Sequence, residues 1–215
     1  MAHDDGVRHR YALRTSRLEA FSDGVFAIAI TLLVLEISVP PGSDDLLAAV
    51  LDQWPSYLAY VVSFATVGAL WIAHTAMTEF LDHADAWFLR LNLLLLLVVS
   101  FVPFPTGLLA ESVGDEGASS VAATVYGLTL LAAALVISSL WRYAVRAALV
   151  RSDAPAGEVR AMTRRLTPGL AGYVVMIAVG LVLPVVSIVG YLVIAVGYLL
   201  PLGSLRRRSS GAGAP

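Results

Sequence analysis

The sequence predicts an all-α membrane protein with six transmembrane helices per subunit and both termini in the cytoplasm. Two observations lead to this fold class: the apolar composition and the placement of the arginines. Of the 215 residues, 58% are hydrophobic and only 14% are charged, and the mean hydropathy is +0.80. Soluble domains carry about 25% charged residues. The long apolar runs therefore favour lipid as the solvent for most of this chain.

Six stretches are apolar and long enough, or nearly so, to cross a hydrocarbon core, which takes about 20 residues. The four best defined cover approximately residues 18–39, 54–77, 87–110 and 120–143. The run 169–202 is too long for one span and predicts two short spans, with the turn between them at residues 184–190. The predicted organisation is an N-terminal leader, residues 1–16, a six-span domain, residues 17–205, and a basic tail, residues 206–215.

The arginines support this count, because they occur only at alternate ends of the predicted spans. Basic residues lie before the first span, after the second, between the fourth and fifth, and after the last, whereas the loops 40–53 and 111–119 contain acidic residues and no arginine. The positive-inside rule then places the N-terminus and the arginine-bearing loops in the cytoplasm. All 14 basic residues are arginine, which is typical of a GC-rich bacterial genome. We therefore expect a multi-pass protein of the bacterial cytoplasmic (inner) membrane.

Several classes of function are disfavoured by the residues that the chain lacks. The sequence contains neither cysteine nor lysine, which removes thiolate catalysis, thiolate metal sites and Schiff-base chemistry. The four histidines are scattered rather than spaced as metal ligands. The basic clusters follow the topology, so they do not indicate nucleic-acid binding. We expect no enzyme activity, metal or cofactor, and the lipid bilayer as a partner.

The first span contains unusual polar residues. An ionised Asp or Arg at membrane depth costs at least about 2.5 kcal/mol unless it is paired. Arg17 and Asp23 are six residues apart, so they face different directions on a helix, and each should find a partner elsewhere. His74 and Asn92 lie at the same predicted depth, so the sequence predicts a buried Arg17–Asp23–His74–Asn92 network. Such a network can join helices or transfer protons, and the joining role is the commoner one.

A second feature of this span is an apolar stripe. Ile28, Leu32 and Leu35 recur at i, i+4 and i+7, so they share one face of a helix, while Asp23 lies on nearly the opposite side. Thr31 lies at the edge of the stripe, and Glu36 follows it at the outer end. The spacing alone fits ordinary helix packing, a subunit interface or a pore lining.

The string RLEAFSDGVFAIAITLLVLEI resembles the signature first helix of the transmembrane protein 175 family of endosomal and lysosomal potassium channels and their bacterial relatives. The similarity extends loosely through the first three spans, and the last three spans are generic. The matching arginine-x-x-x-Phe-Ser-Asp element is Arg17, Phe21, Ser22 and Asp23, and the looser similarity includes Trp71, His74 and Asn92.

The resemblance implies a homotetramer whose first helices line a central pore, with potassium as the permeant ion. It places a hydrophobic constriction at Ile28, Leu32 and Leu35, and a hydroxyl layer linked to ion preference at Thr31. The Phe-Ser-Asp element would brace the pore helix through His74 and Asn92, and the remaining matched residues would belong to the same brace. The position of Glu36 after the stripe, together with the acidic outer loops, separately predicts negative charge at the outer mouth. The sequence contains no TVGYG filter. A potassium-preferring cation channel with a hydrophobic gate is therefore the expected function.

A proton-coupled transporter or a proton leak is the alternative. It would use Asp23 and His74, with His83 as a further candidate. Transporters usually contain internal repeats and broken helices at the midplane. The first three spans show neither feature, which favours the channel.

Overall fold

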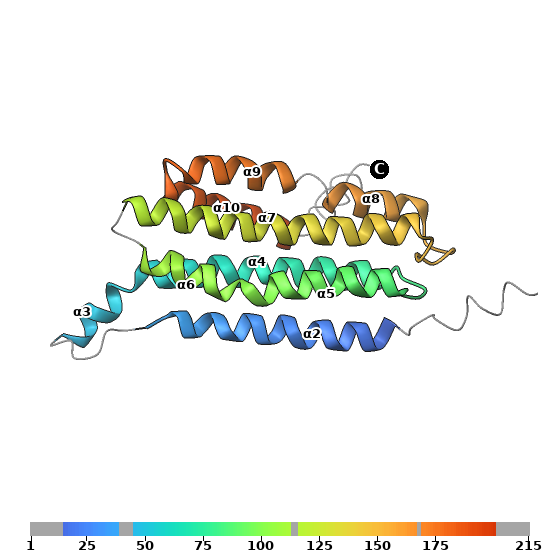
Figure 1. Ribbon diagram of the computed structural model, residues 1–215, viewed down its shortest axis with the longest axis horizontal. Helices are drawn as coiled ribbons and strands as arrows, with labels where there is room; N and C mark the ends of the chain where they lie inside the picture. Colours follow the sequence, from blue (N-terminus) through green and yellow to red (C-terminus); the bar gives the residue numbers. More distant parts are fainter. Residues whose placement is uncertain (1–14, 39–44, 113–115, 167–168, 201–215) are drawn as a thin grey trace, which may run out of the picture.

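The computed structural model describes residues 15–38, 45–112, 116–166 and 169–200. Nearly all of the predicted N-terminal leader and the whole basic tail lie outside these residues. Within the described part, the regular structure is helical, apart from isolated β-bridge positions, among them the pair Leu81 and Val150. The helices run along one common axis and form an elongated bundle (Figure 1).

Four long apolar segments correspond to the first four predicted spans. Within the described residues, these four are long and apolar enough to cross a membrane. The predicted span 54–77 agrees with its helix to within one residue at the C-terminal end. The segments comprise α2 (Thr15–Leu32) with the 3-10 turn η2 (Leu33–Glu36), α4 (Trp54–Thr78), α5 (Ala86–Phe101) with α6 (Pro103–Glu111), and α7 (Glu116–Arg146).

The third predicted span is broken rather than continuous, so the expectation that the first three spans contain no broken helix is wrong. α5 ends at Phe101 and α6 begins at Pro103, so a short interruption divides the stretch that the hydropathy predicts as one helix. Pro103 is in the first turn of α6, where its missing N–H has no intrahelical acceptor to lose. The prolines 103 and 105 therefore account for the break.

The last apolar run forms two short helices, α9 (Gly169–Gly180) and α10 (Pro184–Leu199). The predicted turn at residues 184–190 is wrong, because the turn occupies residues 181–183 and Pro184 begins α10. Proline favours the first helical position, where its fixed φ suits the helix, so it marks a helix start here rather than a turn. The two helices have 12 and 16 residues. They extend about 18 and 24 Å, less than a hydrocarbon core of about 30 Å.

Two further helices lie in segments predicted as loops. α3 (Leu46–Leu51) begins at Asp45, whose carboxylate accepts a 3.1 Å hydrogen bond from the Ala48 backbone N–H. α8 (Ala156–Leu166) buries Met162 and Leu166. The i, i+4 spacing of these two apolar residues between arginines is the signal that would have found α8.

The bundle has three layers and two chemically different ends. In Figure 1, α2 forms one outer layer, α4 with α5 and α6 the middle, and α7 with α9 and α10 the other side. α2 and α5 begin, and α4 and α7 end, at the same end of the bundle, next to α8. We call this the arginine end, because it carries all the described arginines, namely Arg17, Arg90, Arg142, Arg146, Arg151, Arg160, Arg164 and Arg165.

Candidate functional site on helix α2

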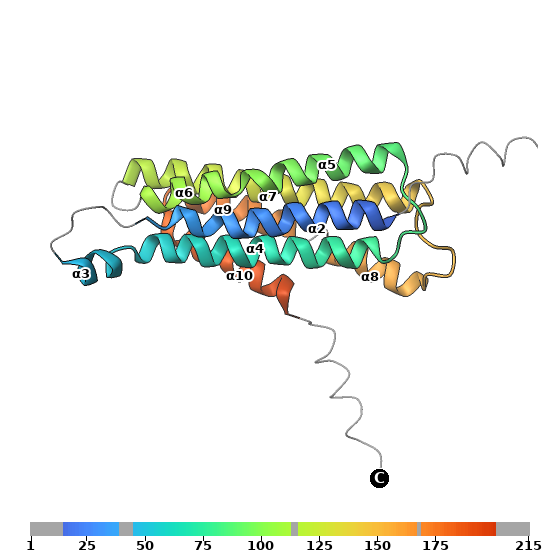
Figure 2. The ribbon, with the colours of Figure 1, turned by 90° about the horizontal axis from the view of Figure 1, so that it is seen from below.

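Helix α2 is covered on one side only. Its buried residues recur every three or four positions and face α4 and α5. Of the most apolar 18-residue stretch in this segment, 28% is buried within the chain, whereas the corresponding share for α7 is 50%. Figure 2 shows α2 running lengthwise between α4 and α5. The buried face consists of Leu18, Ser22, Phe26, Ala29 and Leu33.

The apolar stripe lies on the uncovered side of α2. The exposed fractions of Ile28, Leu32 and Leu35 are 60%, 40% and 70%. Thr31 lies beside them, also exposed, and its hydroxyl donates a 2.9 Å hydrogen bond to the Ile28 carbonyl oxygen. The hydroxyl oxygen keeps lone pairs that can accept from outside the helix. None of the described residues covers the stripe, so it is open to a contact from outside them.

A chain of three buried polar side chains joins α2 to the next two helices. Asn92 donates from Nδ2 to Ser22 Oγ at 3.0 Å, and its Oδ1 lies 2.8 Å from His74 Nε2. Because Oδ1 can only accept, the proton of this second bond is on His74 Nε2. Phe26 lies against the His74 ring, with the ring centroids 5.7 Å apart. Polar groups paired in this way fix the position of α2 against α4 and α5.

The predicted four-residue network is therefore wrong in its membership. Ser22, not Asp23, enters the buried chain. Asp23 is exposed, and its Oδ1 accepts a 2.8 Å hydrogen bond from Trp71 Nε1. Neighbouring residues on a helix diverge by about 100°, so only one of this pair can face α5. Arg17 is exposed and has no ion pair among the described residues.

Two aromatic members of the predicted brace also lie outside the buried chain. Phe21 is 58% exposed and Trp71 is 41% exposed. Phe21 therefore points away from the polar contacts, while Trp71 donates a hydrogen bond to Asp23 at the edge between α2 and α4. His83, the further proton-transfer candidate, lies in the exposed loop after α4, with its Nδ1 3.1 Å from Asp82 Oδ2.

The exposed carboxylate of Asp23 limits what can lie against the uncovered face of α2. Asp23 lies eight residues after the start of α2, about 12 Å along the helix axis. Ionisable residues at membrane depth almost always face a bundle interior or a water-filled cavity, because lipid cannot solvate them. In the predicted topology, protein or water against the Asp23 flank of α2 would solvate this carboxylate, which lipid could not do.

The other end of α2 is positioned by a glycine that the sequence did not single out. The Glu36 carboxylate lies against α6 at Gly107, where an added Cβ would lie 2.0 Å from Glu36 Oε2. Glu36 is thus half-buried between helices rather than fully turned outward. Its predicted place at an outer mouth stays a prediction.

A second buried polar junction belongs to the scaffold. Ser63 Oγ lies 2.8 Å from Thr106 Oγ1 and 2.9 Å from Tyr126 Oη, which joins α4, α6 and α7. Within the described residues, no three or more His, Cys, Asp or Glu side chains gather where a metal ion could bind.

Comparisons with known proteins agree with this architecture. Residues 17–103 match the family model described as the endosomal/lysosomal potassium channel TMEM175. The chain is 42% identical over 189 residues to the Streptomyces collinus protein named potassium channel B446_29190, covering 86% of this chain and 91% of that one. A human relative named endosomal/lysosomal proton channel TMEM175 matches over 101 residues with 43% identity, or 42% of this chain and 20% of the relative.

A solved structure matches over most of the chain. It is the crystal structure of a lysosomal potassium-selective channel TMEM175 homologue from Chamaesiphon minutus, with a TM-score of 0.78, 41% sequence identity, and coverage of 86% of this chain and 96% of that one. The fold and these matches define a multi-pass membrane protein of an ion-channel class rather than an enzyme class. The chain belongs to the TMEM175 family, which confirms the resemblance carried by Arg17, Phe21, Ser22 and Asp23.

Proposed function

We propose that this protein is a potassium-preferring cation channel that assembles as a homotetramer, with four copies of α2 around a central pore. The observation that carries the proposal is the uncovered side of α2, which presents an apolar stripe on one flank and a membrane-depth carboxylate, Asp23, on the other. The apolar flank could face lipid, but lipid cannot solvate the carboxylate, which therefore favours protein or water against this side of α2. Whole-length relatives that are named potassium channels support the choice of ion.

In this proposal the stripe forms the constriction. Rings of Ile28, Leu32 and Leu35 would narrow the pore, because these side chains project from the uncovered side of α2. A hydrophobic ring offers no ion-binding site, so it gates by dewetting. Potassium sheds its water more easily than sodium, which gives a preference without carbonyl ligands. The Thr31 hydroxyl layer would assist this preference, and Glu36 would lie near the outer mouth.

The buried chain of Ser22, Asn92 and His74 then has a mechanical role. It holds the back of α2 against α4 and α5 while the stripe faces the pore. Four such anchored helices keep a defined pore radius, since each helix is fixed by its own subunit.

The membrane topology completes the proposal. α9 and α10 would serve as the fifth and sixth spans despite their length, with the arginine end in the cytoplasm of a bacterium. Local thinning of the bilayer or tilting of neighbouring lipids accommodates short apolar helices at modest cost.

Reconstitution into liposomes tests the proposal. We expect potassium efflux that exceeds sodium efflux, and a rise in both when Leu32→Ala or Leu35→Ala widens the constriction. Leu97→Ala is the matched control, since Leu97 is 65% exposed on α5, away from α2. Equal fluxes in all three variants and the unchanged protein would overturn the assignment of the constriction.

A proton pathway is the second candidate, suggested by the name of the human relative. The geometry does not favour it, because the described contacts join His74 to Ser22 through Asn92 and leave Asp23 on Trp71. Proton flux abolished by Asp23→Asn, with potassium flux unaffected by the leucine variants, would favour this candidate. The mass of the detergent-purified assembly is an independent check, since a monomer excludes a pore shared by four subunits.

A further inference from the structure

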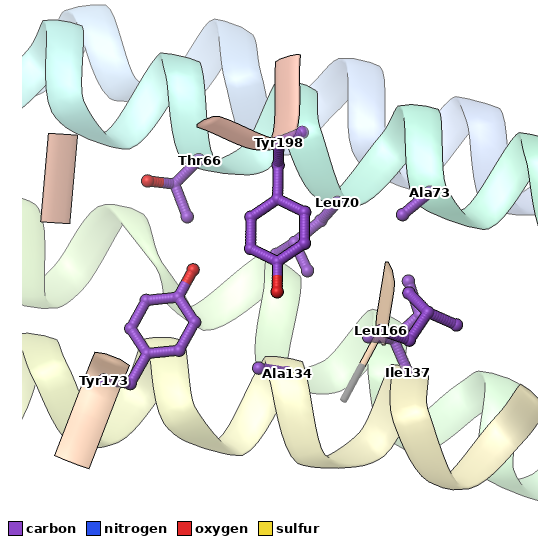
Figure 3. Close-up of a pocket in the computed structure, with 9 residues that line it drawn as sticks. Thr66, Leu70, Ala73, Ala134, Ile137, Leu166, Tyr173 and Tyr198 are labelled. Atoms are coloured by element: carbon purple, nitrogen blue, oxygen red, sulfur yellow. The ribbon is translucent and has the colours of Figure 1, made fainter. Parts of the chain in front are cut away.

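A small hollow opens among the peripheral helices, on the side of the bundle away from α2. The described residues that line it come from α4, α7, α9 and α10 and from the last residue of α8. Most of the lining is apolar, and Thr66, Tyr173 and Tyr198 contribute hydroxyl groups to it. Figure 3 shows the rings of Tyr173 and Tyr198 pointing into the space between α4 and α7.

The size of the hollow limits what can occupy it. Its volume is about 30 Å³. A cavity needs roughly 10–15 Å³ to hold a water molecule, so this one has room for about one or two waters and not for a larger organic ligand. Waters inside proteins bind two to four polar groups, whereas dry cavities have apolar walls. The three hydroxyl groups therefore favour water as the occupant.

The depth of the hollow makes a hydrogen-bond partner valuable there. Thr66 is the thirteenth of the 25 residues of α4, so the hollow lies near the middle of that span. Hydrocarbon can neither donate nor accept a hydrogen bond, and a hydroxyl group that is buried without a partner costs free energy. A water held inside the protein removes that cost.

Tyr173 is the side chain that most needs such a partner. It is 4% exposed and lines the hollow, and its hydroxyl forms no hydrogen bond with the part of the chain that the structure describes. Its helix, α9, packs mainly on α7 and α10. The Tyr173 ring extends from α9 into the hollow (Figure 3), where a water would meet its hydroxyl group.

The other two hydroxyl groups can bind the same water. Thr66 Oγ1 donates a 2.8 Å hydrogen bond to the Val62 carbonyl oxygen, which leaves its lone pairs to accept another. Tyr198 lies near the end of α10, where Arg165 Nη2 donates a 2.5 Å hydrogen bond to its backbone carbonyl oxygen. This bond holds the backbone of Tyr198 beside the hollow, and a phenolic oxygen can accept as well as donate.

We propose that the hollow is a binding site for ordered water, held by Tyr173 together with Thr66 and Tyr198. The Tyr173 hydroxyl donates to the water, and the water donates to Thr66 Oγ1, so that α9 and α4 are joined through it. The hollow lies on the opposite side of the bundle from α2, so the site is independent of which ion the α2 assembly conducts.

Tyr191 provides a matched comparison within the same cluster of rings. It stacks on Tyr173, with the ring centroids 6.3 Å apart, and it is fully buried. Its Oη has no hydrogen-bond partner among the described residues. Protein atoms crowd this oxygen, because a Cβ added to Gly127 would lie 2.0 Å from it. Of these two neighbouring hydroxyl groups, only that of Tyr173 faces room for a water.

Thermal unfolding of the full-length protein in detergent compares the two tyrosines. Tyr173→Phe should lower the midpoint by about 2–4 °C, because it removes a hydrogen-bonded group. Tyr191→Phe should raise it by up to about 2–4 °C, because it removes a buried hydroxyl without a partner. A midpoint that stays the same or rises in Tyr173→Phe would overturn the proposal, since it would show that the Tyr173 hydroxyl is not hydrogen-bonded either.

Filling the hollow gives a second test. Ala134 lines the hollow on α7, and Ala134→Val would displace the water and leave the Tyr173 hydroxyl without a partner. We expect the midpoint to fall by about 2–4 °C in the unchanged background and by much less in Tyr173→Phe, because the two sites are coupled through the water. Equal effects in both backgrounds, or a gain in stability from Ala134→Val, would show a dry cavity and overturn the proposal.

A structure of the full-length protein that resolves ordered waters is the direct test. We expect water density within about 3 Å of Tyr173 Oη, its loss in Tyr173→Phe, and its retention in Tyr191→Phe. A hollow without water density, or one crossed by continuous lipid or detergent density, would contradict the assignment.

Discussion

Helices α2 and α7 are almost equally apolar, yet a much smaller share of α2 is buried within the chain. The most apolar stretch of 18 residues in each is similar in hydropathy, but 28% of that stretch is buried within the chain for the α2 segment and 50% for α7. α7 packs against helices on several sides, whereas α2 packs mainly against α4 and α5. Apolarity identified both as membrane helices, and the difference in burial identifies α2 as the one with more surface left uncovered among the described residues. In the assembly proposed above, other subunits would cover part of that surface.

The largest loss of stability should follow truncation in α7. Trp141 is 1% exposed, packs edge-on to Phe80, and donates from Nε1 to Thr163 Oγ1 at 2.8 Å. Trp141→Ala should lower the free energy of unfolding by about 3–5 kcal/mol, because it leaves a large cavity. Chemical denaturation in detergent measures this. Trp87→Ala, at a 61% exposed site on α5, should cost far less, and equal losses would contradict the distinction between buried scaffold and exposed surface.

The next largest loss should come from the buried junction behind α2. Asn92→Leu removes both hydrogen bonds and leaves His74 and Ser22 without their partner. We expect a loss of about 1–3 kcal/mol from the unsatisfied groups, toward the lower figure if the helices find other partners in the membrane. Ser100→Ala is the control on α5, since the Ser100 hydroxyl bonds only the carbonyl of Leu97 in its own helix. A neutral Asn92→Leu would show that α2 is held by apolar packing alone.

A smaller loss of stability should follow from crowding the Glu36 side chain, at the other end of the segment formed by α2 and η2. Gly107→Ala places a methyl group where the Glu36 carboxylate lies, so the carboxylate must move. We expect about 1 kcal/mol of destabilisation, at the low end for overpacking, because the end of a side chain shifts more easily than a backbone. Gly68→Ala on α4 meets nothing within 4 Å and should be neutral or stabilising by up to about 1 kcal/mol. The two variants behaving alike in thermal unfolding would contradict this role for Gly107.

The smallest change in subunit stability should come from the exposed stripe. Leu35 is 70% exposed in the single chain, so Leu35→Ala loses few contacts within it. We expect an effect within about 0.5 kcal/mol on subunit unfolding, together with the rise in ion flux that follows from a wider constriction if four stripes meet. A variant that loses stability as Trp141→Ala does, with normal flux, would place the stripe in the scaffold.

The sequence predicted the helices of the scaffold well and their breaks poorly. Residues 54–77 were located almost to the residue, because one uninterrupted apolar run is bounded by polar segments. The interruption between α5 and α6 and the start of α10 at Pro184 were missed. Hydropathy averaged over a window does not register a proline that begins a helix, although the preference of proline for that position could have corrected both.

The buried polar chain was predicted only in part. Depth in the membrane grouped His74 and Asn92 with Asp23, and the structure joins the first two by a hydrogen bond, but their partner on α2 is Ser22, which only the family resemblance had named. Whether Ser22 or Asp23 enters the core depends on the rotation of α2 about its axis, and the stripe alone left that rotation open. Gly107 could not be found, because a glycine that makes room for a neighbour has no pattern of its own.

What the sequence by itself determined is the class of the protein, its family and the end of the bundle that carries the arginines. These follow from apolar runs, from charge placement and from a motif of adjacent residues, all of which are local. The tertiary structure alone decided that Ser22 faces inward and Asp23 outward, that Glu36 rests on Gly107, and that a hollow opens beside Arg165. Each of these depends on how helices distant in sequence rotate and slide against one another, and packing sets those two quantities through side-chain shape rather than through composition.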